Sequence, residues 1–172
     1  VLGMTYHPSL SPLIHASVGF AETPHGSVLL CASPEGLLLC GYVHQADELL
    51  ARLDRGGVVI HDGPEPAPIL AGRAFLMASF RGEDPGPPPP LWLRGTDLQR
   101  RLWLQLLNLP RGGLISYAEL SRRWDRAPES AAIARALRDC PLPLFVPLHR
   151  VADVEDRCAG HGLTLPTPLA AA

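Results

Sequence analysis

The first half of the chain contains two apolar runs that flank a turn. The runs extend from Ser27 to Ala32 and from Leu37 to Val43, with Ser33-Pro34-Glu35-Gly36 between them. Proline and glycine in such a segment favour a tight turn, so the pattern predicts a β-hairpin within residues 23–43. We therefore expect a sheet in this half of the protein.

Helical spacing follows the hairpin. Leucines in residues 45–53 recur at helical intervals, and Arg55-Gly56-Gly57 ends the pattern before a short apolar run from Val58 to Ile60, which predicts another strand. A second helix is predicted over residues 68–80. Its expected core-facing side chains are Leu70, Ala74, Met77 and Ala78.

A proline-rich stretch separates the two halves of the chain. Residues 82–90 end in four consecutive prolines. Proline has no N–H group, so this stretch cannot enter a helix or the interior of a sheet, and it favours an extended conformation. We predict an N-terminal domain over residues 1–84, a linker over 85–94 and a C-terminal domain over 95–172.

Beyond the linker the hydrophobic pattern is helical. A leucine stripe predicts a core-packing helix over residues 97–109. A second helix is predicted from Tyr117 to about Trp124, because Ser116 is placed to cap it and Glu119 follows three residues later, as in a capping box. These two helices would form the first part of the C-terminal domain.

A third helix is predicted over residues 130–139. This segment is rich in alanine and leucine, and Cys140-Pro141 ends it. Because it follows the preceding helix after a tight turn, the two helices predict a helix-turn-helix, a motif that places its second helix in a groove of DNA.

Charge differs between the two halves. The chain has 172 residues, of which 47% are hydrophobic and 19% are charged, as is typical of a globular protein. All 15 of its basic residues are arginine, and its net charge is −2. Residues 1–90 carry a charge of −5 and residues 91–172 a charge of +3. This asymmetry indicates nucleic acid as a partner. A solvated arginine surface is the alternative explanation.

Membrane and metal chemistry have little support in the sequence. No apolar run reaches the roughly 18 residues that cross a bilayer, and no secretory signal pattern is present, so we expect a cytoplasmic monomer without membrane contact. Cys31, Cys40, Cys140 and Cys158 form no CxxC pair. We expect reduced thiols, no cofactor and no metal, with a zinc site that uses His25 or another N-terminal histidine as the alternative for Cys31 and Cys40.

Four segments of the chain resemble the O6-alkylguanine-DNA alkyltransferase family. They are Thr23-Pro24-His25-Gly26 with its hairpin, Gly95-Thr96-Asp97-Leu98-Gln99 with Trp103, Ser116-Tyr117-Ala118-Glu119-Leu120, and Pro141-Leu142-Pro143-Leu144-Phe145-Val146-Pro147-Leu148-His149-Arg150-Val151. The last is the most specific, because the family has Pro-Cys-His-Arg-Val at its end. The resemblance implies an α/β protein with a ribonuclease H-like N-terminal domain of sheet and helices, and a helical C-terminal domain with a helix-turn-helix.

The chain departs from this family at the position that accepts the alkyl group. Family members flip the damaged guanine out of the duplex and transfer its alkyl group to a cysteine thiolate, which a neighbouring histidine keeps deprotonated. Leu148 stands at this position, and a leucine side chain has no lone pair and no acidic proton. The resemblance therefore implies a protein that transfers no alkyl group and retains His149 as a vestige.

The resemblance also implies a base pocket and a set of DNA contacts. The implied pocket residues are Pro147, Leu148, Cys158 and Ala159. Cys158 or Ala159 replaces an aromatic residue of the family, which weakens stacking on the flipped base. The implied contacts with double-stranded DNA are Tyr117, Arg122, Arg123, Arg135 and Arg138. The arginine that the family inserts into the base stack corresponds to Ala131, and Arg135, one helical turn later, is a candidate replacement.

Two other functions stay open at this point. An active methylated-DNA–protein-cysteine methyltransferase would use Cys140 or Cys158 as its nucleophile. A scaffold or partner-binding protein would bind no DNA, and its arginines would be solvated while Tyr117 packed on Trp124.

Overall fold

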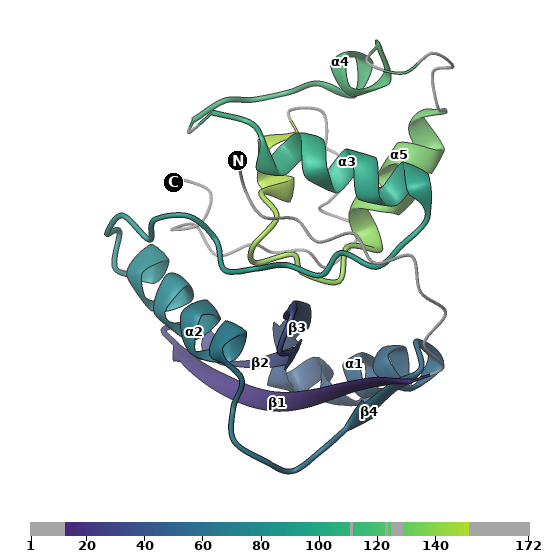
Figure 1. The fold of residues 1–172 in the computed structure, drawn as a ribbon. Helices are drawn as coiled ribbons and strands as arrows, with labels where there is room; N and C mark the ends of the chain where they lie inside the picture. Colours follow the sequence, from purple (N-terminus) through teal and green to yellow (C-terminus); the bar gives the residue numbers. More distant parts are fainter. Residues whose placement is uncertain (1–12, 111, 123, 125–128, 152–172) are drawn as a thin grey trace. The chain divides into compact units, whose positions relative to one another are not determined.

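The computed structural model describes residues 13–110, 112–122, 124 and 129–151. The chain divides into two compact units, one ending at Leu93 and the other beginning at Arg94. The N-terminal unit combines strands with helices and the C-terminal unit is helical (Figure 1). The predicted mixed α/β fold is confirmed. In the described part of the chain, no helix is both long and apolar enough to span a membrane.

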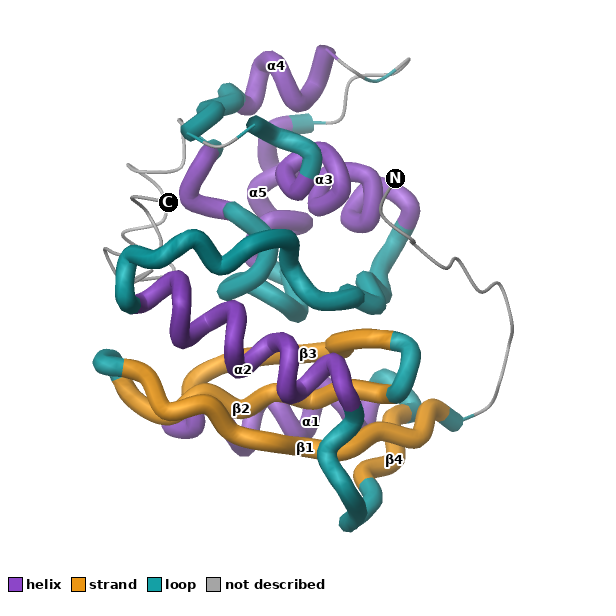
Figure 2. The backbone as a smooth tube through the Cα atoms, turned by 60° about the vertical axis from the view of Figure 1, so that its left-hand side comes forward, coloured by secondary structure: helices purple, strands orange, loops and turns teal. Residues whose placement is uncertain are grey.

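A four-stranded sheet forms the N-terminal unit. Strands β1 (Ile14–Thr23), β2 (Gly26–Ser33) and β3 (Gly36–Tyr42) are antiparallel neighbours, and the short β4 (Val58–Ile60) pairs with β1 in parallel. The order across the sheet is β3-β2-β1-β4 (Figure 2). The predicted hairpin and the predicted strand from Val58 to Ile60 are confirmed.

The hydrophobic runs did not predict strand β1. Its buried residues, Ala16, Gly19 and Ala21, are scattered instead of forming a run, and His15 and Phe20 are exposed. β1 has a hydrogen-bonded neighbour on each side, so the backbone groups of this weakly apolar segment are satisfied by tertiary pairing.

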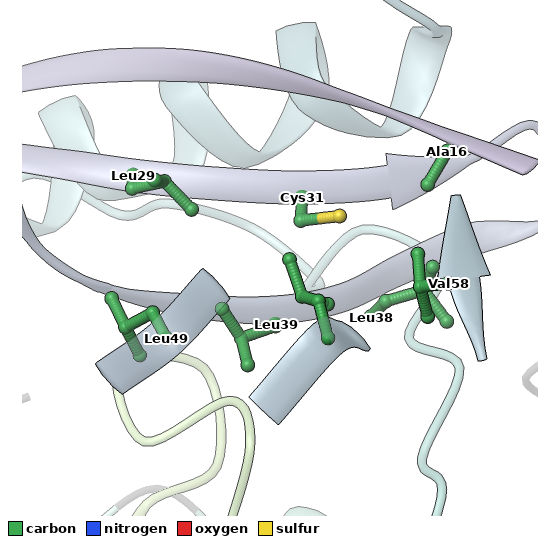
Figure 3. Close-up of a cluster of buried hydrophobic side chains, with 8 residues drawn as sticks. Ala16, Leu29, Cys31, Leu38, Leu39, Leu49 and Val58 are labelled. Carbon is green, nitrogen blue, oxygen red and sulfur yellow. The ribbon is translucent and has the colours of Figure 1, made fainter. Parts of the chain in front are cut away.

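Helix α1 (Ala46–Arg55) covers one face of the sheet, and it confirms the predicted helix there. Leu49 and Leu53 are its buried residues. They join a core cluster whose other members are Ala16, Leu29, Cys31, Leu38, Leu39 and Val58 (Figure 3). Acidic residues in the first turn of α1 and arginines in its last turn suit the dipole of the helix.

Helix α2 (Ala67–Phe80) packs on the opposite face, but not through the predicted side. Its buried residues include Ile69, Leu76 and Phe80, whereas Leu70 is 52% exposed. Ala74 is also exposed, and the remaining two predicted core residues, Met77 and Ala78, are only half-buried. The predicted core face of this helix is therefore wrong.

The sheet decides which face of α2 is buried. The helix is apolar on most sides, so the spacing of its residues does not select a face. Gly19 of β1 permits a close approach at this point, because a Cβ atom there would lie 2.7 Å from Ile69 Cγ2. The absence of a side chain at Gly19 thus lets Ile69 pack directly against the strand.

The end of the proline-rich stretch lies along the free edge of β3. The Leu37 N–H donates to the Pro90 carbonyl at 2.9 Å, and the Trp92 N–H donates to the Leu37 carbonyl at 2.8 Å. A Cβ atom on Gly36 would lie 2.8 Å from the Pro90 carbonyl oxygen, so the glycine at this position permits the contact. Residues 90–92 therefore pair with the start of this edge, at Leu37, where the backbone groups would otherwise be unpaired.

Three helices and a short 3-10 turn build the C-terminal unit. They are α3 (Asp97–Leu107), α4 (Tyr117–Arg122), α5 (Ser130–Arg138) and η2 (Leu148–Arg150). Each α-helix begins at the residue predicted from the sequence, and α3 ends two residues before the predicted Leu109.

Trp103 joins α3 to α5. Its side chain is fully buried, and Nε1 donates to the Ala136 carbonyl at 2.9 Å. Leu102 and Leu106 are buried on the same helix, as the leucine stripe predicted. The tryptophan therefore supplies both apolar area and a directional hydrogen bond at the centre of this unit.

Candidate functional site

The segment that carries the most specific resemblance forms the turn η2. Leu148 begins this turn, is 5% exposed, and donates its backbone N–H to the Val146 carbonyl at 2.8 Å. Its neighbour Pro147 is half-buried. The side chain of Leu148 is hydrocarbon only, so this buried position offers no atom that can attack an electrophile.

His149 has a buried nitrogen without a partner. The ring is half-buried, and Nε2 has no hydrogen-bond partner among the described residues. Burial, and secondarily the charge of Arg150, lower the pKa of the His149 imidazole. Burial therefore favours the neutral form of the ring.

Arg150 ties η2 to the loop that leads into α4. Its Nη1 donates to the Pro110 carbonyl at 3.1 Å, and its own carbonyl accepts from the Ile115 N–H at 2.9 Å. A parallel bridge between Ile115 and Val151 continues the contact. Arg150 is therefore structural, and it brings the start of α4 close to Leu148 and His149.

The exposed face of α5 carries two arginines. Arg135 and Arg138 are exposed and, within the described residues, neither is in an ion pair. Ala131 lies on the same exposed face, and Ile133 is buried on the other side of the helix. The guanidinium groups are thus presented to solvent, as binding to an anionic partner requires.

Helix α4 carries the other candidate contacts that the structure describes. Tyr117 is its first residue and is half-buried, and Arg122 is its last and is exposed. Ser116 Oγ accepts the Glu119 N–H at 3.2 Å, which is the predicted N-terminal cap. Candidates Arg123, Cys158 and Ala159 lie outside the described residues.

The cysteines that the structure describes are buried. Cys140 is 2% exposed directly after α5. Burial raises the pKa of the Cys31 thiol to about 12. Leu30 pairs with Cys40 and Cys31 pairs with Leu39, so Cys31 and Cys40 point to opposite faces of the sheet and cannot share a metal ion. Among the described residues, no group of three or more His, Cys, Asp or Glu side chains is placed to hold a metal.

Gln99, which belongs to one of the motifs that resemble the family, has a structural role that the motif alone does not predict. Its Oε1 accepts the Thr96 N–H at 2.9 Å, Thr96 Oγ1 accepts the Gln99 N–H at 3.3 Å, and its Nε2 donates to Asp139 Oδ2 at 3.3 Å. The spacing Thr-x-x-Gln is the signal that could have revealed this capping box. Through Asp139, Gln99 links the start of α3 to the end of the arginine-bearing helix.

Comparisons with known proteins agree on one family. A family model described as "6-O-methylguanine DNA methyltransferase, DNA binding domain" matches residues 97–167. The methylated-DNA–protein-cysteine methyltransferase of Mycobacterium tuberculosis is 33% identical over 102 residues, which are 59% of this chain and 62% of that protein. The constitutive enzyme of that name from Bacillus subtilis is 29% identical over 142 residues, covering 82% of this chain and 83% of that protein.

Solved structures give the same result. The crystal structure of the M. tuberculosis O6-methylguanine methyltransferase has a TM-score of 0.59 and 27% identity, covering 81% of this chain and 78% of that one. A crystal structure of the M. tuberculosis protein in complex with DNA has a TM-score of 0.59 and 26% identity, covering 80% of this chain and 78% of that one. By sequence, however, the chain spans 62% of the length of the mycobacterial relative that it matches.

Proposed function

Because the chain belongs to the O6-alkylguanine-DNA alkyltransferase family, we propose that it is a DNA-binding homologue with a role in DNA repair that transfers no O6-alkyl group. One observation carries the proposal: Leu148 occupies the second position of Pro-Leu-His-Arg-Val, where the family has its acceptor cysteine. Alkyl transfer needs a thiolate at this point, because the sulfur forms the new bond to carbon while guanine O6 leaves. Leucine cannot form that bond.

The surroundings of Leu148 support a site without transfer chemistry. Burial favours the neutral form of His149, and neither of its sequence neighbours is a cysteine that it could deprotonate. Cys140 is the described alternative nucleophile, but its side chain is buried, and a sulfur that attacks a DNA base has to be accessible to that base. Transfer by Cys140 would require a rearrangement at the end of α5.

The arginines of α4 and α5 support binding to duplex DNA. We propose that these two helices form a helix-turn-helix, that Tyr117, Arg122, Arg123, Arg135 and Arg138 contact the phosphate backbone, and that the N-terminal unit has the ribonuclease H-like topology of the family. The exposed guanidinium groups of Arg135 and Arg138 suit phosphate oxygens, which accept two hydrogen bonds from one arginine. Because Ala131 stands where the family has its intercalating arginine, Arg135, one helical turn later, is the candidate to enter the base stack.

A transfer assay tests the chemical part of this proposal. The protein is incubated with duplex DNA that carries radiolabelled O6-methylguanine, with the M. tuberculosis methyltransferase as the active control. No label is expected on this chain. Label on the wild type that disappears in Cys140→Ser or Cys158→Ser would instead identify an active methyltransferase with a substitute nucleophile.

A salt titration tests the binding part. Fluorescence anisotropy with a labelled duplex should show an affinity that falls steeply as salt rises, because each neutralised phosphate releases counterions. Comparison of an O6-methylguanine duplex with an unmodified duplex measures any preference for the lesion. Absent binding at low salt would leave the scaffold function.

A further inference from the structure

Two histidines from distant parts of the sequence lie in contact at the edge of the sheet where β4 pairs with β1 in parallel. His15 lies on β1 and His61 follows β4, and His15 Nδ1 is 2.5 Å from His61 Nε2. Both side chains are exposed to solvent. The backbone holds them together, because His15 pairs with Val59 and the His61 N–H donates to the Ala16 carbonyl at 2.9 Å.

The close approach of the two nitrogens is that of a hydrogen bond between two imidazole rings. Two nitrogen lone pairs repel each other at this separation, so one ring has to donate its proton to the other. A metal ion that accepts a lone pair from each ring can replace this proton. With metal–nitrogen bonds of about 2.0–2.1 Å and a tetrahedral angle, the two nitrogens would lie roughly 3.3 Å apart. Small rotations of two exposed side chains can supply this change.

We propose that His15 and His61 form a two-histidine binding site for a divalent transition metal ion of the zinc, nickel and copper class. Imidazole nitrogen is a preferred ligand of these ions. Because no group of three or more ligating side chains occurs in the described part of the chain, water would complete the coordination. An ion held in this way is exchangeable.

The proposed ion would act as a clamp on the sheet. β4 has three residues, and its pairing with β1 is limited to the register from Ile14–Val58 to Ala16–Ile60. The two histidines are 46 positions apart in the chain, so only the folded pairing brings their nitrogens together. An ion that binds both rings therefore binds the folded state in preference to the unfolded chain and stabilises it.

Metal titration of the untagged full-length protein tests this site. Zn²⁺, Ni²⁺ and Cu²⁺ are titrated separately, with binding measured by calorimetry and stability by the melting temperature. We expect one ion per chain at this site and a higher melting temperature. His15→Gln and His61→Gln should each lower the affinity by about tenfold or more, because each removes one of two protein ligands, and each should remove the thermal shift.

Control variants and a spectroscopic measurement make the test decisive. His44→Gln changes an exposed histidine that stacks on Tyr42 elsewhere in the same unit, and it should leave metal binding unchanged. The paramagnetic resonance spectrum of the wild-type protein with Cu²⁺ should show two nitrogen ligands, a result that does not depend on the folding of any variant. Absence of saturable binding, or binding that survives both His15→Gln and His61→Gln, would overturn the proposal.

Discussion

Arginine has different environments in the two units of this chain. In the N-terminal unit, Arg73 Nη2 donates to both carboxylate oxygens of Glu65 at 2.7 and 2.9 Å, and Nε donates to the Phe20 carbonyl at 2.7 Å. In the C-terminal unit, Arg135 and Arg138 are exposed and have no ion-pair partner among the described residues. The first arginine is committed to the fold, whereas the other two are available to a ligand.

The C-terminal unit also contains structural arginines. Arg150 donates to the Pro110 carbonyl. Arg101 Nε lies 3.1 Å from Asp97 Oδ2, and Arg101 Cζ lies 5.4 Å from the centre of the Trp124 ring. The basic charge of this half therefore overstates the number of arginines that can contact DNA. Partners and exposure, and not residue type, separate binding arginines from structural ones.

Trp103→Ala should have the largest effect on stability, because Trp103 packs α3 against α5, the helix that carries Arg135 and Arg138. Truncation of a fully buried tryptophan should lower the free energy of unfolding by about 3–5 kcal/mol, and it also removes the bond to the Ala136 carbonyl. Chemical denaturation measures the change. Leu114→Ala, at a position 68% exposed, is the control and should change stability little. Equal effects of the two substitutions would contradict the assigned core.

Replacement of Arg135 and Arg138 tests directly whether the exposed face of α5 binds DNA. Arg135→Ala combined with Arg138→Ala should weaken DNA binding and reduce the slope of log affinity against log salt by about two, since each lost phosphate contact removes about one unit. Stability should be nearly unchanged. Arg55→Ala, which removes an exposed arginine from α1, should leave the slope as it is. If the wild type and the double arginine variant show the same slope, the α5 arginines do not contact phosphate.

Replacement of the ion-pair partner tests the committed arginine. Glu65→Gln should lower the free energy of unfolding by about 1 kcal/mol, because Arg73 Nη2 contacts both carboxylate oxygens but the pair is still about a third exposed. DNA affinity should not change. Glu83→Gln, at an exposed position after α2, is the matched control. If Glu65→Gln loses DNA affinity while its stability stays intact, Arg73 is not a purely structural arginine.

The smallest effect is expected from protonation of His149. Its pKa is lowered in the folded state, so the unfolded chain binds the proton more strongly. Stability should therefore fall as the pH drops below about 6.5, the value of an unperturbed histidine, and this loss should be complete below the lowered pKa. His149→Gln should reduce the pH dependence of the unfolding free energy. An identical pH profile for wild type and His149→Gln would rule out this contribution.

Local patterns predicted the elements of the fold that have strong local signals. The hairpin, β4 and the start of each helix in the C-terminal unit follow from turn residues, caps and hydrophobic spacing. β1 escaped prediction, because its side chains are only weakly apolar and its stability comes from strands on both sides. The buried face of α2 was predicted incorrectly for a related reason: an apolar helix needs a partner such as Gly19 to select its orientation.

The candidate site also combines features that the sequence determines with features that only the tertiary structure determines. The inert side chain of Leu148 is a property of the sequence, because the chemistry of a hydrocarbon side chain does not depend on its surroundings. The similarity to the alkyltransferase family, too, is carried by motifs along the chain. Only the tertiary structure decided that Arg150 binds the Pro110 carbonyl, that Arg135 and Arg138 are exposed, and that His15 reaches His61. These properties depend on distances between residues far apart in the chain, and such distances exist only once the strands and helices have packed.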